Sequence, residues 1–206
     1  TIGRRQRQMC IRDRYVIDLN RDPSGKPLYA DGRTTTQLVP THTFFGQLLY
    51  PQMLPTEEDI QLRKERFFYP YHLQLREELQ QLQKTFSHVL LWDAHSIRHF
   101  VPTIRGDPFP DLILGSQNGF SASSELIRIA VSHLSEDKTY DFRENDPFKG
   151  GYITRHYGNP HQGIHALQLE MAKSLYMDEE TSTYIPNCAA KIRTILIETL
   201  TALASQ

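Results

Sequence analysis

The sequence predicts an α/β protein with a mixed central sheet and helices on both faces of that sheet. Short apolar runs such as HVLLWD (88–93) and DLILGS (111–116) are typical of buried strands. Between such runs lie longer segments whose apolar residues recur at steps of three and four, as in amphipathic helices. This alternation favours a sheet covered by helices. With 206 residues, the chain is long enough for one domain with a sizeable core.

The elements follow from local patterns, taken in chain order. The apolar run at 15–19 indicates a strand, whereas residues 30–55 lack a sustained period and are expected to be irregular. Thr56, followed by acidic residues, is an expected helix N-cap, and Pro70 should kink or split that helix. The same criteria predict strands at 88–93 (buried on both faces), 111–116, 139–145 and 151–158 (leading into a loop), and helices at 123–134 and 186–204. Residues 164–177 are expected to begin as a strand and then either continue as a strand or turn into a helix.

Composition and charge disfavour several classes of partner. The formal net charge is −1 and the pI is about 6.7, so neither nucleic acid nor an anionic membrane is an expected partner. No apolar run approaches the length of a membrane span. The two cysteines, Cys10 and Cys188, have no C-x-x-C spacing, so a reducing cytoplasm is the expected location.

Residues 1–14 differ from the rest of the chain. They contain five arginines and no apolar period, and MCIRDR (9–14) resembles the translation of a transposase adaptor used to build sequencing libraries. We therefore expect this segment to be foreign to the gene and exclude it from the fold. The alternative is a genuine basic arm that binds an acidic partner. The protein domain is accordingly expected to cover residues 15–206.

The first candidate site is Asp93-Ala-His95, at the end of a predicted strand. Residues two apart on a strand face the same side, so the two side chains are expected to be neighbours. A histidine there could bind a metal through one ring nitrogen while the carboxylate supports the other. The alternative is a structural histidine in a polar rim, because one histidine alone does not make a metal site.

The second candidate is DLNRDP (18–23), in which Asn20 and Arg21 lie just past the first predicted strand. The fork of Arg21, with the amide of Asn20 beside it, suits a substrate carboxylate, and Asp18 could hold the arginine in place. The alternative is a loop fastened by a surface ion pair.

The third candidate is FKGGYITRHYGNP, in which Lys149, Arg155 and His156 surround a pair of glycines. Such a group could bind an anionic substrate. A nucleotide phosphate is not expected, because the chain has neither a P-loop nor a G-x-G-x-x-G motif. The alternative is a glycine-rich hairpin whose cations are solvated.

The fourth candidate is Glu170, within the apolar strand HALQLEM. Burying a carboxylate costs free energy, so a functional role is expected to account for it. The role of general base is one such role. The alternative is a glutamate on the solvent face of an edge strand.

Five segments together resemble one known family. YVIDLNRD, LLWDAHSIR, PDLILGSQNG, FKGGYITRHYG and HALQLEMAKSLYMDE occur in the order and approximate spacing found in N-formylglutamate deformylases, also called N-formylglutamate amidohydrolases. The resemblance covers residues from about 15 to the C-terminus. It implies a zinc-exopeptidase-like (phosphorylase/hydrolase-like) fold, a divalent metal with zinc as the expected ion, and hydrolysis of N-formyl-L-glutamate, a dicarboxylate, during histidine degradation.

The resemblance also implies roles for individual residues. His95 would be a metal ligand supported by Asp93, and Glu170 would be the general base. Asn20 and Arg21 would bind a substrate carboxylate. The other implied substrate or oxyanion contacts are Arg155, His156, Arg98 and Lys149.

The resemblance fails at one place. Family members begin with a strand that ends in a Pro-His-small-Gly motif, followed by an acid, and these look like two further metal ligands. Residues 1–14 do not match this pattern, so we expect the chain to be an N-terminally truncated piece with an impaired metal site. The alternatives are a deacylase for another N-acyl amino acid and a carboxylate-binding protein without catalysis.

Overall fold

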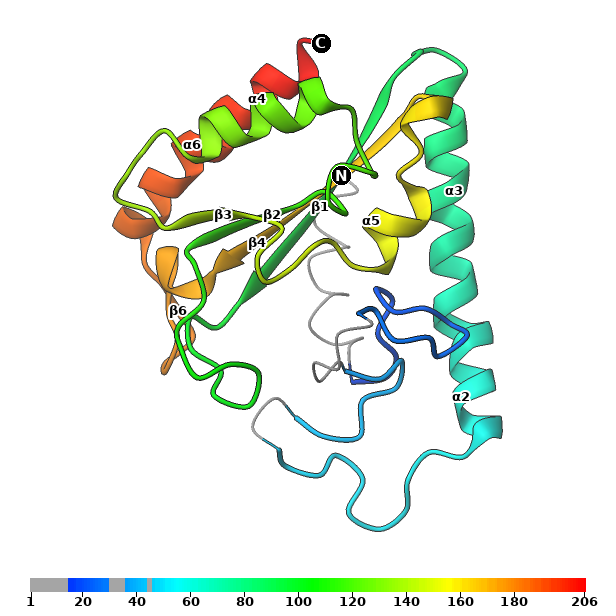
Figure 1. Ribbon diagram of the computed structural model, residues 1–206. Coiled ribbons are helices and arrows are strands. Elements are labelled where there is room, and N and C mark those ends of the chain that lie inside the picture. The colour runs from blue at the N-terminus through cyan, green and yellow to red at the C-terminus, as the bar shows by residue number, and fades with distance from the viewer. Residues whose placement is uncertain (1–14, 30–35, 44–45) are drawn as a thin grey trace. The chain divides into compact units, whose positions relative to one another are not determined.

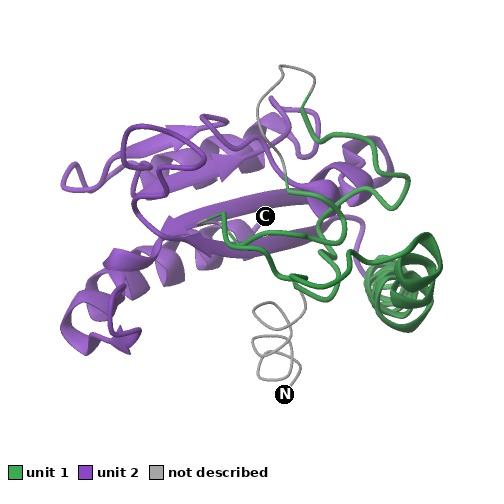
Figure 2. Ribbon diagram, turned by 90° about the horizontal axis from the view of Figure 1, so that it is seen from below, with its two compact units in different colours: residues 1–85 green, residues 86–206 purple. Residues whose placement is uncertain are grey.

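The computed structural model describes residues 15–29, 36–43 and 46–206, so the expectation about residues 1–14 lies outside the described residues. The chain divides into two compact units, Thr1–Thr85 and Phe86–Gln206 (Figure 2). The prediction of a single domain over residues 15–206 stays a prediction. Each unit is described below by itself.

The elements alternate between helices and strands (Figure 1). In chain order they are helix α2 (Glu57–Arg63), the π-helical turn η1 (Lys64–Phe68), α3 (Tyr69–Gln83), strand β1 (Val89–Ile97), β2 (Leu112–Gly115), α4 (Ser124–Leu134), β3 (Phe142–Glu144), α5 (Tyr152–Tyr157), the 3-10 turn η2 (Pro160–Gln162), β4 (Ile164–Ala172), the 3-10 turn η3 (Lys173–Leu175), β5 (Met177–Asp178), β6 (Thr183–Tyr184) and α6 (Pro186–Ala204).

The first unit contains one long helical segment, α2–η1–α3. Its start at Thr56 is as predicted: the Thr56 hydroxyl accepts the N–H of Asp59, and the Asp59 carboxylate accepts the N–H of Thr56. The predicted interruption near Pro70 is confirmed, because the π-helical turn η1 separates α2 from α3 just before this proline.

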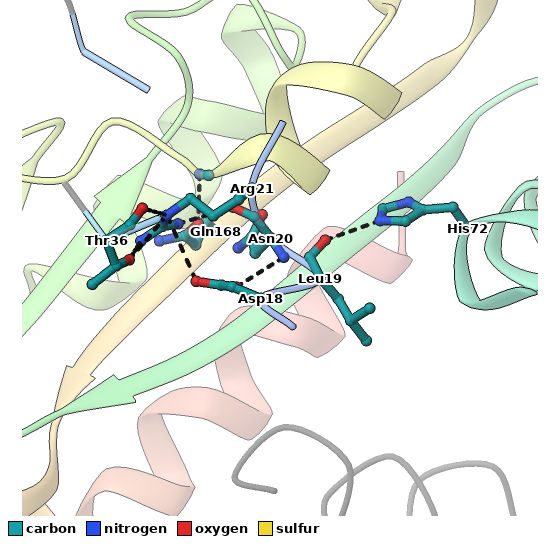
Figure 3. A network of polar contacts seen from close by, with 8 residues as sticks. Asp18, Leu19, Asn20, Arg21, Thr36, His72 and Gln168 are labelled. Atoms are coloured by element: carbon teal, nitrogen blue, oxygen red, sulfur yellow. Dashed lines mark hydrogen bonds and ion pairs between the residues drawn. The ribbon is translucent and has the colours of Figure 1, made fainter. Parts of the chain in front are cut away.

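The predicted strand at 15–19 is wrong. These residues form turns and irregular backbone, and separate contacts satisfy their polar groups in place of a neighbouring strand. The N–H of Asp18 donates to the carbonyl of Leu38 at 2.6 Å. Arg63 Nη1 donates to the carbonyl of Val16 at 2.9 Å, and His72 Nε2 lies 2.9 Å from the carbonyl oxygen of Leu19 (Figure 3). Backbone polar groups in a buried segment need partners, and here the helical segment and Leu38 supply them.

The second unit is built on a four-stranded mixed sheet in the order β1-β4-β2-β3. β1 runs parallel to β4, β4 is antiparallel to β2, and β2 is parallel to β3. The predicted fold class, α/β with a mixed sheet, is therefore confirmed. β1 is at the end of this order, and most of its residues are only half-buried, so the prediction that it is buried on both faces is wrong.

One face of the sheet packs against α4 and α6, which lie side by side (Figure 1). The helix α4 is strongly amphipathic and starts at Ser123, whose hydroxyl accepts the N–H of Leu126. The fully or nearly buried residues of this core are Leu112, Leu114, Ala122, Leu126, Ile127, Ala130, Leu134, Leu167, Leu169, Ile192 and Leu203. Burial of this apolar surface is the main stabilising contribution in the unit.

The segment 151–158 differs from its prediction, because Tyr152–Tyr157 is the short helix α5 instead of a strand. Ile153, Thr154 and Tyr157 are all buried, and this spacing places them on one side of a helix. Packing has therefore overridden the β-propensity of the local sequence. Throughout the described part of the chain, each helix is too short or too polar to span a lipid bilayer.

Candidate active site

A row of polar side chains lies on the face of the sheet that does not carry α4 and α6. In the parallel pairing of β1 with β4, Asp93 is opposite Gln168 and His95 is opposite Glu170. Residues in register point to the same face, whereas Trp92 and Leu167, one position earlier on each strand, belong to the apolar core. The sheet therefore gathers two carboxylates, an imidazole and an amide on one surface.

Asp93 and His95 are in direct contact on β1. The Nε2 atom of His95 lies 2.9 Å from Oδ1 of Asp93, and the two side chains are only 12% and 10% exposed, Asp93 first. Their spacing of two residues makes this contact a consequence of the strand pleat. If the ring of His95 is neutral and its Nε2–H donates a hydrogen bond to Asp93, the lone pair of the ring is on Nδ1.

Glu170 is buried on a central strand. It is 8% exposed, and β4 is flanked by β1 on one side and β2 on the other, with Ile113 opposite Glu170 on β2. The alternative reading, a glutamate on the solvent face of an edge strand, is therefore wrong. A buried carboxylate next to a histidine is typical of sites that carry out acid–base chemistry.

The loop before α5 rests on the same face of the sheet. The Oε1 atom of Gln168 accepts the N–H of Gly151 at 2.7 Å. Gly115 on β2 lies so close to this loop that an added Cβ would be 2.5 Å from the nitrogen of Gly150. The helix α5 is thereby attached beside the polar row, and α5 also contacts β4 and β1.

This close approach makes Gly115→Ala a sharp test of the loop position. The new Cβ would collide with backbone atoms of Lys149 and Gly150, so we expect a loss of about 1–3 kcal/mol in unfolding free energy. Thermal denaturation measures this loss as a lower Tm. Gly106→Ala is the matched control, because an added Cβ there meets nothing within 4 Å. Equal Tm values for the two variants would contradict the close packing of the loop.

The three predicted cations of this segment have different surroundings. Arg155 Nε donates to the carbonyl of Gly150 at 2.8 Å, which folds its side chain back towards the start of α5. His156 is exposed and stacks on Tyr152, with ring centroids 4.8 Å apart. Lys149 is half-buried. The alternative of a glycine-rich hairpin is wrong, because this segment contains a helix.

Arg98, another predicted substrate contact, is engaged with the β5–β6 hairpin. Its Nη2 donates to the carbonyl of Glu179, and the Glu179 carboxylate accepts the N–H groups of His99 and Ser174 at 2.8 and 3.2 Å. These bonds fasten the segment that follows β1. Glu179 was not predicted from the sequence, since an acid in a polar loop gives no signal by itself.

The first unit holds the other predicted cluster (Figure 3). Asp18 is 2% and Asn20 6% exposed, and Asp18 Oδ1 accepts the N–H of Asn20 at 3.0 Å. The guanidinium of Arg21 lies 3.6 Å from Asp18 and donates to Thr36 and to the carbonyl of Asn20. Asp18 thus supports Arg21, and the roles of both residues stay predictions.

A contact between two histidines, His165 and His88, was not predicted from the sequence. His165 Nδ1 accepts the N–H of Ser123 at 3.1 Å, and its Nε2 lies 3.3 Å from Nδ1 of His88. Burial, and then the nearby His88, lower the pKa of His165 below its usual 6.5, which favours the neutral ring that can accept this bond. His165 follows the alternation of Leu167 on β4, so it supports the start of α4 on the apolar face.

The polar row offers one side chain that suits a metal ligand. His95 suits one ligand position, because a carboxylate that holds one ring nitrogen is the usual support for a metal-binding histidine. However, no group of three or more His, Cys, Asp or Glu side chains suited to a metal occurs among residues 15–29, 36–43 and 46–206. His95 is therefore one expected ligand among the described residues, and the metal stays a prediction.

Comparison with known proteins gives a consistent result. A family model described as N-formylglutamate amidohydrolase matches residues 11–177. Two curated relatives, from Pseudomonas putida and Pseudomonas aeruginosa, are both named N-formylglutamate deformylase. They are 43% and 41% identical to the chain over 192 residues, which is 92% of this chain and 71% of each relative.

Solved structures agree with this assignment. The crystal structure of N-formylglutamate amidohydrolase from Ralstonia eutropha matches with a TM-score of 0.74 and 25% identity, over 93% of this chain and 74% of that one. A gene product of Agrobacterium tumefaciens has the same fold, with a TM-score of 0.67 and 18% identity over 93% of this chain and 68% of that one. The family expected from the sequence motifs is confirmed: this chain belongs to the N-formylglutamate amidohydrolase family.

Proposed function

We propose that this protein hydrolyses N-formyl-L-glutamate to formate and L-glutamate. The observation that carries the proposal is the buried Glu170, in register with His95 on a polar sheet face, in a chain of this family. The names of the relatives that are 43% and 41% identical support the same substrate. In this reaction, water adds to the formyl carbon, the C–N bond breaks, and the amine leaves with a proton taken from the water.

In the proposed mechanism, Glu170 is the general base. Its carboxylate accepts a proton from the attacking water while the oxygen–carbon bond forms, and then gives that proton to the nitrogen as the C–N bond breaks. Burial keeps bulk water away from the carboxylate, which strengthens its interactions with the reacting groups. One group can thus act first as base and then as acid.

The substrate carboxylates are proposed to bind to the cationic side chains. Arg21 is the main candidate, because an arginine has five N–H donors and the bonds to Thr36 and Asn20 leave one on each Nη. Two parallel N–H groups match the two oxygens of a carboxylate. Asn20 is proposed as its neighbouring contact, and Arg155, Arg98, Lys149 and His156 are proposed as further contacts to the dicarboxylate.

We also propose that the enzyme uses a divalent metal, with zinc as the expected ion, and that His95 is one ligand with Asp93 behind it. A bound metal of this kind lowers the pKa of its water and so supplies a nucleophile near neutral pH. The contact of 2.9 Å between Asp93 and His95 supports this assignment. The proposal places the reaction in histidine degradation in the cytoplasm, without nucleic acid or membrane as a partner.

Formate release tests the proposed function. The purified protein would be incubated with N-formyl-L-glutamate, N-acetyl-L-glutamate and N-formyl-L-aspartate, with and without added zinc, and the products would be quantified. We expect formate from N-formyl-L-glutamate above all. Preferred cleavage of either other compound would favour a related deacylase. Binding of N-formyl-L-glutamate without any cleavage would favour a carboxylate-binding protein.

Arg21→Lys tests the carboxylate contact. Lysine keeps the positive charge near the buried Asp18 but cannot form two parallel hydrogen bonds with a carboxylate. Loss of a hydrogen bond between charged groups is worth about 1.5–3 kcal/mol, so we expect KM to rise by about 10–100-fold with a much smaller change in kcat. Steady-state kinetics would measure both constants.

The control for this variant is Arg76→Lys, an exposed arginine on α3, which should leave KM unchanged. If Arg21→Lys had a normal KM and a lower Tm instead, Arg21 would be a structural residue that fastens its own loop. That outcome would favour the ion-pair interpretation of the DLNRDP segment.

A further inference from the structure

Gln168 occupies the middle of the polar row and has no role in the mechanism above. It is 5% exposed, lies opposite Asp93 on β1, and precedes Glu170 by two residues on β4. An amide has two ends, an oxygen that accepts hydrogen bonds and an NH2 group that donates them. A buried glutamine is therefore expected to have partners at both ends.

The orientation of this amide is fixed by the loop before α5. Gly151 offers a backbone N–H, which is a donor, so the atom 2.7 Å away must be the oxygen of Gln168. The NH2 group is then directed away from Gly151. Within the part of the chain that the structure describes, Gln168 makes no hydrogen bond other than this one. The NH2 group of this buried residue is thus oriented and available for an acceptor on a ligand.

The position of this donor suits the reacting carbonyl group. Residues rise by about 3.3 Å along a strand, so Gln168 and Glu170 are attached about 6.6 Å apart and point to the same face. A carbonyl carbon between the two side chains could receive water activated by Glu170 while its oxygen accepts from Gln168. Such a site, within about 3 Å of both the nucleophile and an oxyanion donor, is what amide hydrolysis requires.

We propose that the Gln168 Nε2–H group donates a hydrogen bond to the formyl oxygen of the substrate. This inference rests on the proposed function, because it assumes a formamide as the ligand. When the oxygen of water bonds to the formyl carbon, the π electron pair of the carbonyl moves to its oxygen, and the bond from Gln168 strengthens as that charge develops. The electron pair on the oxygen re-forms the C=O bond when the C–N bond breaks and the proton reaches the leaving nitrogen.

Gln168→Glu separates this role from a structural one. The glutamate still has an oxygen that can accept the N–H of Gly151, but it has lost the NH2 donor. Loss of one oxyanion donor typically lowers kcat by about 10²–10³-fold, and we expect a fall of this size with little change in KM or Tm. Gln162→Glu, at an exposed position after α5, is the control and should leave kcat unchanged.

The pH dependence of kcat distinguishes the lost donor from the added charge. A negative charge beside Glu170 would raise the pKa of Glu170, so activity would recover at higher pH if that were the only effect. We expect the plateau of the pH–rate profile to stay low instead. A plateau equal to that of the unaltered protein would overturn the proposal.

Nuclear magnetic resonance provides a readout that does not depend on turnover. The side-chain NH2 signals of Gln168 are the pair absent from Gln168→Glu, and they would be followed in a Glu170→Gln background during titration with N-formyl-L-glutamate. We expect one of the two protons to shift downfield. Unshifted signals at saturating ligand would overturn the proposal. A downfield shift in the Glu170→Gln background, combined with no formate release by the unaltered protein, would retain the donor role and reject the proposed function.

Discussion

Replacing Glu170 with glutamine is expected to lower kcat for formate release by about 10²–10⁴-fold, the range that general acid–base catalysis contributes. Glutamine has the same shape as glutamate but cannot take a proton from water at neutral pH. KM should change little, because the substitution removes no cation that binds the substrate. The Tm should be kept or raised, since a neutral amide replaces a carboxylate that is only 8% exposed.

The control for this variant is Glu136→Gln, at an exposed position after α4, which should behave like the unaltered protein. Steady-state kinetics and thermal denaturation, measured on both variants, separate a loss of catalysis from a loss of folding. Near-normal kcat for Glu170→Gln would remove Glu170 from the role of general base. A large fall in Tm with normal kcat would make the buried carboxylate a structural group.

His95→Ala is expected to abolish metal binding and, with it, formate release. A catalytic zinc normally has three protein ligands, so removal of one histidine leaves too few donors to retain the ion. Zinc content after dialysis, measured by mass spectrometry, should fall from the level held by the unaltered protein to almost none. Asp93→Asn is a milder change, since loss of the group that supports a metal ligand typically costs about 10–100-fold in metal affinity.

The matched control is His161→Ala, an exposed histidine in η2, which should keep both metal and activity. Metal content and activity are read separately, so the two proposals for this residue can fail independently. Unchanged zinc content in His95→Ala would exclude His95 as a ligand. Loss of activity with unchanged zinc would make the Asp93–His95 pair a direct participant in proton transfer.

Much of the second unit could be predicted from the sequence because its elements are long and periodic. The apolar runs of β1 and β2 and the amphipathic period of α4 and α6 are local signals that packing reinforces. The short helix α5 was mispredicted, because a helix of 6 residues with three buried side chains is too short to show a helical repeat of apolar residues in the sequence. The segment at 15–19 failed for another reason: its backbone hydrogen bonds are made with residues distant in sequence, the side chains of Arg63 and His72 and the carbonyl of Leu38.

The candidate site was predicted to a similar extent. Asp93 and His95 could be paired from sequence because their spacing alone decides their contact on a strand. Glu170 could be singled out from the sequence because burying a carboxylate in an apolar strand costs free energy. Gln168 follows the same alternation but carries no charge, so nothing in the sequence marks it. Its importance depends on the N–H of Gly151, which only the folded chain brings within reach.

The central position of β4 limits how substrate can enter and leave. Glu170 is attached to a strand that is hydrogen-bonded along both sides, to β1 and to β2, so its backbone cannot move far without breaking two ladders at once. Such strands open only with the whole fold, whereas connecting segments open at much lower cost. Any gating step that limits turnover is therefore expected in the loops around the sheet, while the backbone that carries Glu170, the proposed general base, stays in place.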